Sequence, residues 1–342
     1  MYAVLALSSL HRSGSQHALP SVDASLGHYT TAVGQISSKL SSSPADSRLV
    51  ALIACVTFIS FGFLSGRFEE ALDHLRSGLR ILRESPFVHV RDDRVTLLAI
   101  ASAAEEDVFR AIARHNLLAR LFANTNRCSD VSFHWHDETP SSLHFADMES
   151  AWIPLEAIMN DILHLGRKTA GGSHSADLVS KLALDQRQIH SRLGKWLSEY
   201  EKLTPDEDSS MRHRVLYHLL HMWFDMASIM TSTAQHSNNL VFEEHLAPFE
   251  SITKHGTISR SLRSGETPAG PMRFHMLHSL VDVGWIPPLY YTAINCRSQS
   301  VRMRAVELIE SSAHREGIWD SKMAAATAKK VGDSVHGVGC GL

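Results

Sequence analysis

The chain has 342 residues, of which 44% are hydrophobic and 20% charged, which is typical of a globular protein with a sizeable core and argues against disorder. Its formal net charge of −3 offers no basic surface for a phosphate backbone, so we expect no direct nucleic-acid contact. The four cysteines, Cys55, Cys128, Cys296 and Cys340, lie far apart, which argues against a cysteine-built zinc site and a disulfide framework. A reducing compartment is therefore expected.

Apolar residues at helical spacing predict helices in the first part of the chain. The stretch MYAVLALSSLHRSG has no basic segment before its apolar residues, so it predicts a core helix and not a signal peptide. Residues 25–40 predict the next helix. The run LVALIACVTFISFGFL, residues 49–64, is shorter than the ~20 residues that a membrane span needs, so it predicts a buried helix and no membrane association. Gly66 is expected to end this helix, and an amphipathic helix follows to Leu82.

The rest of the chain is also expected to be helical, with two long loops. One helix is predicted over residues 93–122, and a polar loop over residues 123–150. The later predicted helices span residues 152–165, 178–200, 210–233, 240–251, 271–283, 288–296, 299–312 and 319–331, with the second loop over residues 254–271. No segment shows convincing strand alternation. The predicted fold is therefore all-α, a large multi-helix domain of packed antiparallel helices over residues 1–331, followed by a disordered Gly-rich tail over residues 332–342.

One fragment has the pattern of a tetratricopeptide repeat. Residues 63–82, FLSGRFEEALDHLRSGLRIL, contain a helix, a glycine, an aromatic residue and a second helix at that spacing. A repeat fold requires self-similarity at a fixed period, because one unit cannot bury its own face. The following sequence, LLAIASAAEEDVFRAIARHNLLARLF, does not repeat the glycine-aromatic-alanine pattern. The fragment therefore predicts one helical hairpin inside a larger domain.

Five segments follow one another in a defined order along the chain. They are GHYTTAVGQISSKL (27–40), LVALIACVTFISFGFLSGRFEEALDHLRSGLRIL (49–82), RHNLLARL (114–121), PPLYYTAINCRSQSVRMRAVELI (287–309) and HREGIWDSKMAAATA (314–328). In this order they resemble the central and C-terminal regulatory domain of fungal zinc-cluster transcription factors, over most of residues 1–331. The resemblance rests on packing patterns and carries no catalytic signature.

The family usually begins with six closely spaced cysteines that bind two zinc ions, and the 342 residues do not contain such a module. The chain starts at YAVLALSSLHR, inside the first helix of the regulatory domain, so either a truncated form or a standalone descendant fits. The resemblance implies a nuclear, or alternatively cytoplasmic, regulator of a metabolic gene set that has no DNA-reading module of its own. Its partners would be a small-molecule ligand, a full-length zinc-cluster regulator or a second copy of itself.

The 22 histidines supply the candidate metal ligands. His218, His221 and Asp225 fall within roughly 60° of one another on one face of a helix, and two imidazoles with a carboxylate can bind a transition metal. Large apolar flanking residues and the missing HExxH motif favour hydrogen-bonded histidines and no metal. In the segment FHWHDE, His134 and His136 lie on one side if the chain is extended, but further ligands are missing.

A second group of residues suggests a ligand pocket. His275 and His278 form an i, i+3 pair before Trp285, and with Tyr290 and Tyr291 they would line an aromatic-walled pocket for an apolar ligand. Ordinary core packing is the alternative interpretation.

Whether the chain is an enzyme stays open. In an enzyme or ligand-binding protein of fungal secondary metabolism, His221, His275 or His278 would provide acid-base assistance. The sequence has no GxSxG, P-loop or GxGxxG motif, and Cys55 lies in the most apolar helix, where a thiol is inert. No cofactor is predicted.

Overall fold

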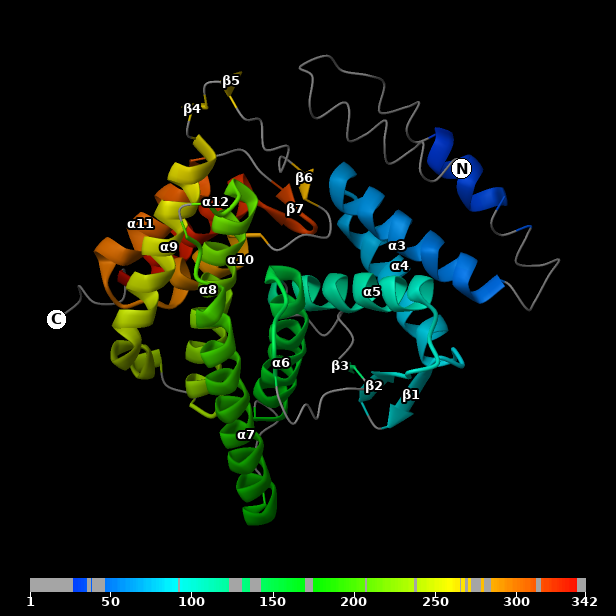
Figure 1. The fold of residues 1–342 in the computed structure, drawn as a ribbon, viewed down its shortest axis with the longest axis horizontal. Coiled ribbons are helices and arrows are strands. Elements are labelled where there is room, and N and C mark those ends of the chain that lie inside the picture. Colours follow the sequence, from blue (N-terminus) through cyan, green and yellow to red (C-terminus); the bar gives the residue numbers. More distant parts are fainter. Residues whose placement is uncertain are drawn as a thin grey trace. The chain divides into compact units, whose positions relative to one another are not determined.

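The structure of the protein, a computed structural model, forms two compact units (Figure 1). The first unit is drawn from Met1–His136, His275–Asp282 and Arg315–Ile318, and the second from Asp137–Phe274, Val283–His314 and Trp319–Leu342. The structure describes residues 27–35, 38, 47–91, 93–122, 131–135, 143–169, 175–206, 208–236, 239–264, 266–267, 270–271, 278–279, 284–311 and 315–336. The single helical domain expected over residues 1–331 stays a prediction, and most of the expected tail lies outside the described residues.

Helices dominate both units. In the first unit they are residues 27–35, α3 (Ser47–Ser65), α4 (Phe68–Arg83) and α5 (Ala103–Phe122). In the second unit they are α6 (Met148–Thr169), α7 (Ala176–Tyr200), α8 (Met211–Thr233), α9 (Leu246–Ser264), α10 (Ile286–Asn295), α11 (Gln299–Glu310) and α12 (Ser321–His336), with the 3-10 helices η1 (Glu201–Leu203) and η2 (Asn239–His245). The all-α fold class predicted from the sequence is confirmed.

The hairpin of α3 and α4 forms as the sequence predicts. Gly66 has φ of 77°, a left-handed conformation that glycine adopts without a steric penalty, and it ends α3. The Gly66 amide donates to the Phe63 carbonyl and the Arg67 amide to the Gly62 carbonyl, the paired bonds of a Schellman motif. The returning helix packs closely on α3, because a Cβ atom added at Gly62 would lie 2.8 Å from the Ala71 Cβ.

A small sheet in the first unit corrects the sequence prediction. β1 (Val88–Arg91) pairs antiparallel with β2 (Arg94–Leu97), and β2 pairs parallel with β3 (Ser132–His134). The helix predicted over residues 93–122 therefore begins only at Ala103, and β3 lies in the segment predicted as a loop. The β-branched residues Val95 and Thr96 favour the strand.

The start of α5 is fixed by a capping box. The Ser102 amide donates to the Glu105 carboxylate at 2.7 Å, and the Glu105 amide donates to the Ser102 hydroxyl at 3.4 Å. The helix is part of the connection from β2 to the parallel strand β3. Its residue Phe109 contacts the rings of Phe133 and Trp135 edge-on. β3 and Trp135 are buried, so this part of the predicted loop belongs to the core.

In the second unit, α8 and α9 run side by side (Figure 1). The core around them is aromatic: Trp196 of α7 and Trp223 of α8 are fully buried, and Trp152 of α6 meets Trp223 edge-on at 5.1 Å between centroids. The Trp196 indole donates to the Ala151 carbonyl at 2.7 Å, which ties α7 to α6. Helices α10, α11 and α12 pack on one another, and α9 packs on α10 and α11.

The second predicted loop is largely wrong. Residues 254–264 continue α9, which starts at Leu246 after η2. Gly256 does not break this helix, because it provides space for packing: a Cβ there would lie 3.2 Å from Leu308 and 3.3 Å from Leu289. Within the helix predicted over residues 271–283, the described residues belong to strands: Pro271 ends β5 (Gly270–Pro271), and His278 and Ser279 form β6 (His278–Ser279), which pairs with β7 (Arg315–Glu316). The remaining short strands are β4 (Glu266–Thr267) and β8 (Trp319–Asp320).

Helix α3 is long and apolar enough to cross a membrane, judged by length and composition alone. Of its apolar window, Arg48–Ser65, 56% is buried inside the structure, as in the core helix of a folded unit. Side chains such as Leu52, Ile59 and Phe63 have no exposed surface. The expectation of a buried helix agrees with this packing, while the absence of membrane association stays a prediction.

Candidate functional site

The predicted face of α8 lies where α9 packs against it. Ser210 caps α8 by accepting a hydrogen bond from the His213 amide at 3.1 Å, which fixes where the helix begins. His218 and His221 are half-buried on this face, and Asp225 lies deeper, with 7% of its surface exposed. The structure therefore confirms that these three residues share one face of a helix.

α9 adds a third imidazole that the sequence analysis missed. A hydrogen bond of 2.9 Å joins the Nδ1 atoms of His218 and His255, so one of the two rings donates and the other accepts. The His221 and His255 rings are stacked, with centroids 4.0 Å apart and planes 5° from parallel. Because His255 falls in the segment predicted as a loop, nothing in the sequence pattern placed it opposite α8.

Burial keeps these imidazoles neutral. Together with the charges of the neighbouring imidazoles, burial lowers the pKa of His218 to about 4 and the pKa of His255 to about 3. The pKa of His221 is also lowered by burial, although the Glu201 carboxylate opposes this shift. The three rings therefore form a neutral cluster near pH 7.

Burial shifts the pKa of Asp225 in the opposite direction, because it disfavours the charged form of any group. Burial raises the pKa of its carboxyl group to about 7, and a hydrogen bond from Ser251 of α9 opposes the shift. Its Oδ2 atom is buried without a hydrogen-bond partner, and the His221 Nε2 atom is 3.8 Å away, beyond hydrogen-bond range. The cluster thus contains a carboxyl group that is divided between its two protonation states near neutral pH.

Tyrosine and tryptophan rings form one wall of the cluster. Tyr200 stacks on Trp196 at 4.5 Å and on Tyr217 at 4.9 Å, and its hydroxyl group donates to the Tyr217 carbonyl. His221 lies 6.1 Å from the Tyr200 ring. Trp196 and Tyr200 have no exposed surface, so the wall is a fixed part of the core.

The three predicted metal ligands do not converge on one point. His218 directs Nδ1 to His255, whereas His221 has Nε2 nearest to Asp225. In the described part of the chain, no group of three or more His, Cys, Asp or Glu side chains is arranged to hold a metal ion. As hydrogen-bonding and proton-binding groups, the residues can exchange protons and recognise polar ligand atoms.

The three predicted pocket residues make separate contacts in the second unit. Tyr290 meets the ring of Trp319 edge-on at 5.2 Å, while Tyr291 stacks on Phe249 at 6.1 Å. Successive residues diverge by about 100° around a helix, so Tyr290 and Tyr291 do not line one wall. Trp285 is 3% exposed. It lies under the Arg263 guanidinium, 3.6 Å from its ring centroid. A ligand pocket among these residues stays a prediction.

The other candidate histidines belong to the first unit or lie outside the described residues. His275 and His136 are outside them, and His278 is described only as part of β6. His134 is buried in β3, and its Nε2 atom is 3.1 Å from the Ser132 hydroxyl oxygen. A role of His134 as a metal ligand and an acid-base role of His278 stay predictions.

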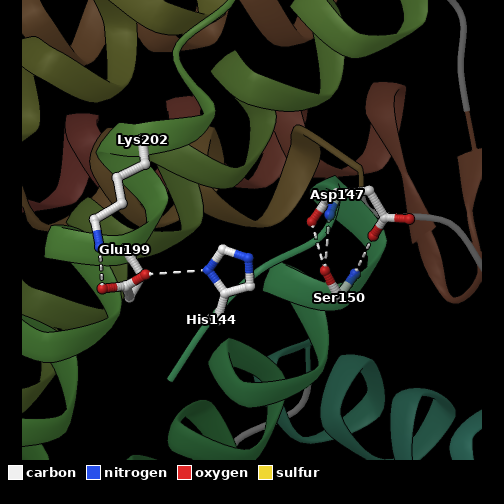
Figure 2. Close-up of polar contacts among 5 residues, drawn as sticks. All are labelled: His144, Asp147, Ser150, Glu199 and Lys202. Carbon is white, nitrogen blue, oxygen red and sulfur yellow. Dashed lines mark hydrogen bonds and ion pairs between the residues drawn. The ribbon is translucent and has the colours of Figure 1, made fainter. Parts of the chain in front are cut away.

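A polar contact network surrounds the start of α6 and the end of α7 (Figure 2). The Ser150 amide donates to the Asp147 carboxylate at 2.7 Å, and the Asp147 amide donates to the Ser150 hydroxyl at 3.0 Å. Glu199 binds Lys202, and the His144 ring is 3.7 Å from the other Glu199 oxygen. These contacts cap α6 and pair charges near the surface, which is a structural function.

Comparison with known proteins relates part of the chain to a fungal regulator. Over 63 residues it is 43% identical to the aspercryptin biosynthesis cluster-specific transcription regulator atnN of Emericella nidulans. The match covers 18% of this chain and 10% of that protein's length. No protein-family profile and no solved structure matches the chain. The partial match supports the transcription-factor-like relationship that the sequence resemblance predicts.

Proposed function

We propose that this protein regulates the expression of a metabolic gene set in a fungus, and that it acts in the nucleus. The observation that carries the proposal is the 43% identity over 63 residues with a regulator named as specific for a biosynthesis cluster. The predominantly helical fold agrees with the resemblance to the regulatory domain of zinc-cluster factors. No residue of this chain is assigned to direct nucleic-acid contact.

The protein would act through ligand or partner binding. A helical unit can respond to a small molecule or a partner by a shift between conformations that bind it with different affinity. The partner would be a full-length zinc-cluster regulator or a second copy of the chain. The α8–α9 contact, with its buried polar groups, offers such a unit a place where helix packing can change.

The experiment is to delete the gene in its source fungus and to measure transcripts and metabolites together. We expect a defined group of transcripts to change, and the wild-type gene to restore them. Complementation with Trp223→Ala, which removes a buried core residue of the second unit, should fail, while Gly194→Ala should succeed because open space surrounds Gly194. A tagged protein should be found in the nucleus. Unchanged transcripts in the deletion strain would overturn the proposal.

A second candidate function is an enzyme or ligand-binding protein of secondary metabolism. The observation that favours it is the close group of His218, His221, His255 and Asp225, in which the Asp225 carboxyl group has a pKa of about 7. A proton-transfer group with such a pKa suits acid-base chemistry. The same deletion experiment separates the two functions. A missing or accumulated metabolite without any transcript change would favour the enzyme, and a metabolite retained by the purified protein without conversion would favour the ligand-binding role.

A further inference from the structure

Three imidazoles meet where α8 packs against α9. His218 and His221 stand one turn apart on α8, and both contact His255 of α9, one by a hydrogen bond and the other by ring stacking. The ring of His255 therefore lies against both α8 histidines. A change in the charge of any of the three rings acts directly on the contact between the two helices.

The contacts among the three imidazoles are incompatible with protonation of more than one ring. The His218–His255 hydrogen bond needs one unprotonated Nδ1 atom, because two protonated rings have no acceptor between them. The stacked rings of His221 and His255 would place two positive charges about 4.0 Å apart. Like charges at this distance repel strongly in a partly buried site. Protonation of more than one ring therefore opposes the packing of α9 on α8.

Charged residues near the cluster shift the protonation of the three imidazoles in both directions. On α8, Arg214 disfavours a proton on His218, and on α9, Lys254 disfavours protons on His221 and His255. Glu201 of η1 favours a proton on His221. From α11, Arg304 donates to the hydroxyl group of Thr257, two residues beyond His255.

Three further titratable groups border the cluster. The rings of Tyr200 of α7 and Tyr217 of α8 lie beside His221, and burial raises the pKa of Tyr200 well above its usual value. Asp225 of α8 is the buried carboxyl group beside His221. Its pKa is about 7 in the folded protein, so below pH 7 it binds a proton while His218 and His255 stay neutral.

We infer that the contact between α8 and α9 is a proton-sensitive joint, in which His218, His221 and His255 hold the helices together at neutral pH and loosen them on acidification. The unfolded chain protonates all three imidazoles below their ordinary pKa of 6.5, whereas the folded joint does not. Asp225 acts in the opposite sense, because the folded state keeps its proton and the unfolded state releases it above pH 3.8. Between pH 4.5 and 6, His218 and His255 together release up to about two protons on folding, whereas Asp225 takes up about one. His221 adds to the release, so the unfolded chain binds more protons than the folded chain and stability falls as the pH falls. The inference does not depend on the proposed function.

The test measures the unfolding equilibrium of the full chain between pH 4.5 and 7.5. Each extra proton that the unfolded chain binds changes the unfolding constant about tenfold per pH unit. His255→Gln should remove at least about one such proton, so its unfolding constant should change at least about tenfold less per pH unit than that of the wild type. Asp225→Asn should strengthen the pH dependence by about the same factor. His144→Gln, which changes a ring that is 80% exposed outside the joint, is the matched control and should leave it unchanged. An unchanged pH dependence in His255→Gln would overturn the inference.

Two measurements on the wild-type protein cover the case in which a variant does not fold. In NMR titrations the His218 and His255 rings should stay neutral down to about pH 5, and titration of both near pH 6.5 would refute the joint. Amide hydrogen exchange, corrected for its intrinsic pH dependence, should show that α8 and α9 lose protection at pH 5 while α12 of the same unit keeps it. Equal loss in all three helices would indicate global destabilisation and would refute a local joint.

Discussion

The indole Nε1 of Trp223 donates a hydrogen bond of 2.7 Å to the carbonyl oxygen of Gly284. Both residues are buried, so this bond ties the middle of α8 to the chain just before α10. A buried carbonyl that loses its donor keeps the whole desolvation penalty. The two residues are far apart in the sequence, and no local pattern predicts their contact.

We expect Trp223→Phe to lower the free energy of unfolding by about 1–3 kcal/mol, because the ring is kept but the Gly284 carbonyl loses its donor. Trp223→Ala should lower it by about 3–5 kcal/mol through the added cavity. Urea unfolding followed by circular dichroism measures both. Equal losses for the two variants would mean that the hydrogen bond, and not the ring volume, dominates.

Gly62→Ala should destabilise the α3–α4 hairpin by about 1–3 kcal/mol, because its new Cβ would lie 2.8 Å from the Ala71 Cβ and force the helices apart. Gly194→Ala is the matched control, since nothing lies within 4 Å of the Cβ position there. It should stabilise α7 by about 0.5–1 kcal/mol through helix propensity. Thermal unfolding of both variants measures the difference, and a neutral Gly62→Ala would contradict the close helix contact.

Asp147→Ala should cost about 1 kcal/mol at pH 7, because it removes the acceptor for the Ser150 amide at the start of α6. The hydrogen bond from this amide is the main reason that the pKa of Asp147 is lowered in the folded protein. The stabilisation is therefore complete above the ordinary pKa of 3.8 and is lost as the pH falls through the lower folded value. The stabilities of the variant and the wild type, measured by chemical denaturation, should begin to converge as the pH falls below 3.8. A difference that does not shrink with falling pH would contradict the charged cap.

Cys55 should resist alkylation in the folded protein. Burial in α3 raises the pKa of its thiol to about 11, so at pH 8 almost no reactive thiolate is present. Mass spectrometry after iodoacetamide treatment should find Cys55 unmodified in the native chain and fully modified in 6 M guanidinium chloride. Labelling at the same rate in both conditions would show that α3 opens readily.

The sequence predicts helices well where an apolar stripe and a helix-ending signal agree. Gly66 follows the last apolar residues of α3 and its positive φ ends the helix there, as predicted. Gly256 misled the same reasoning, because a glycine that allows close packing and a glycine that ends a helix look alike in the sequence. The distinction depends on Leu308 and Leu289, which only the folded structure brings near.

The missed strands have a similar cause. β2 has four residues and β3 has three, too few for periodicity to separate a strand from a helix or a loop. Of the candidate site, the i, i+3 and i+7 spacing on α8 correctly placed His218, His221 and Asp225 on one face. His255 could not be found in this way, since its position opposite that face depends on how α9 packs.

The parallel pairing of β2 with β3 has a consequence for the order of folding. β1 and β2 form a local hairpin, so they can pair as soon as Leu97 has left the ribosome. The opposite edge of β2 stays open until the whole of α5 and the residues up to β3 have been synthesised. During that interval a growing chain exposes an unpaired strand edge, so the speed of translation across α5 determines how long this edge of β2 is open to misassembly.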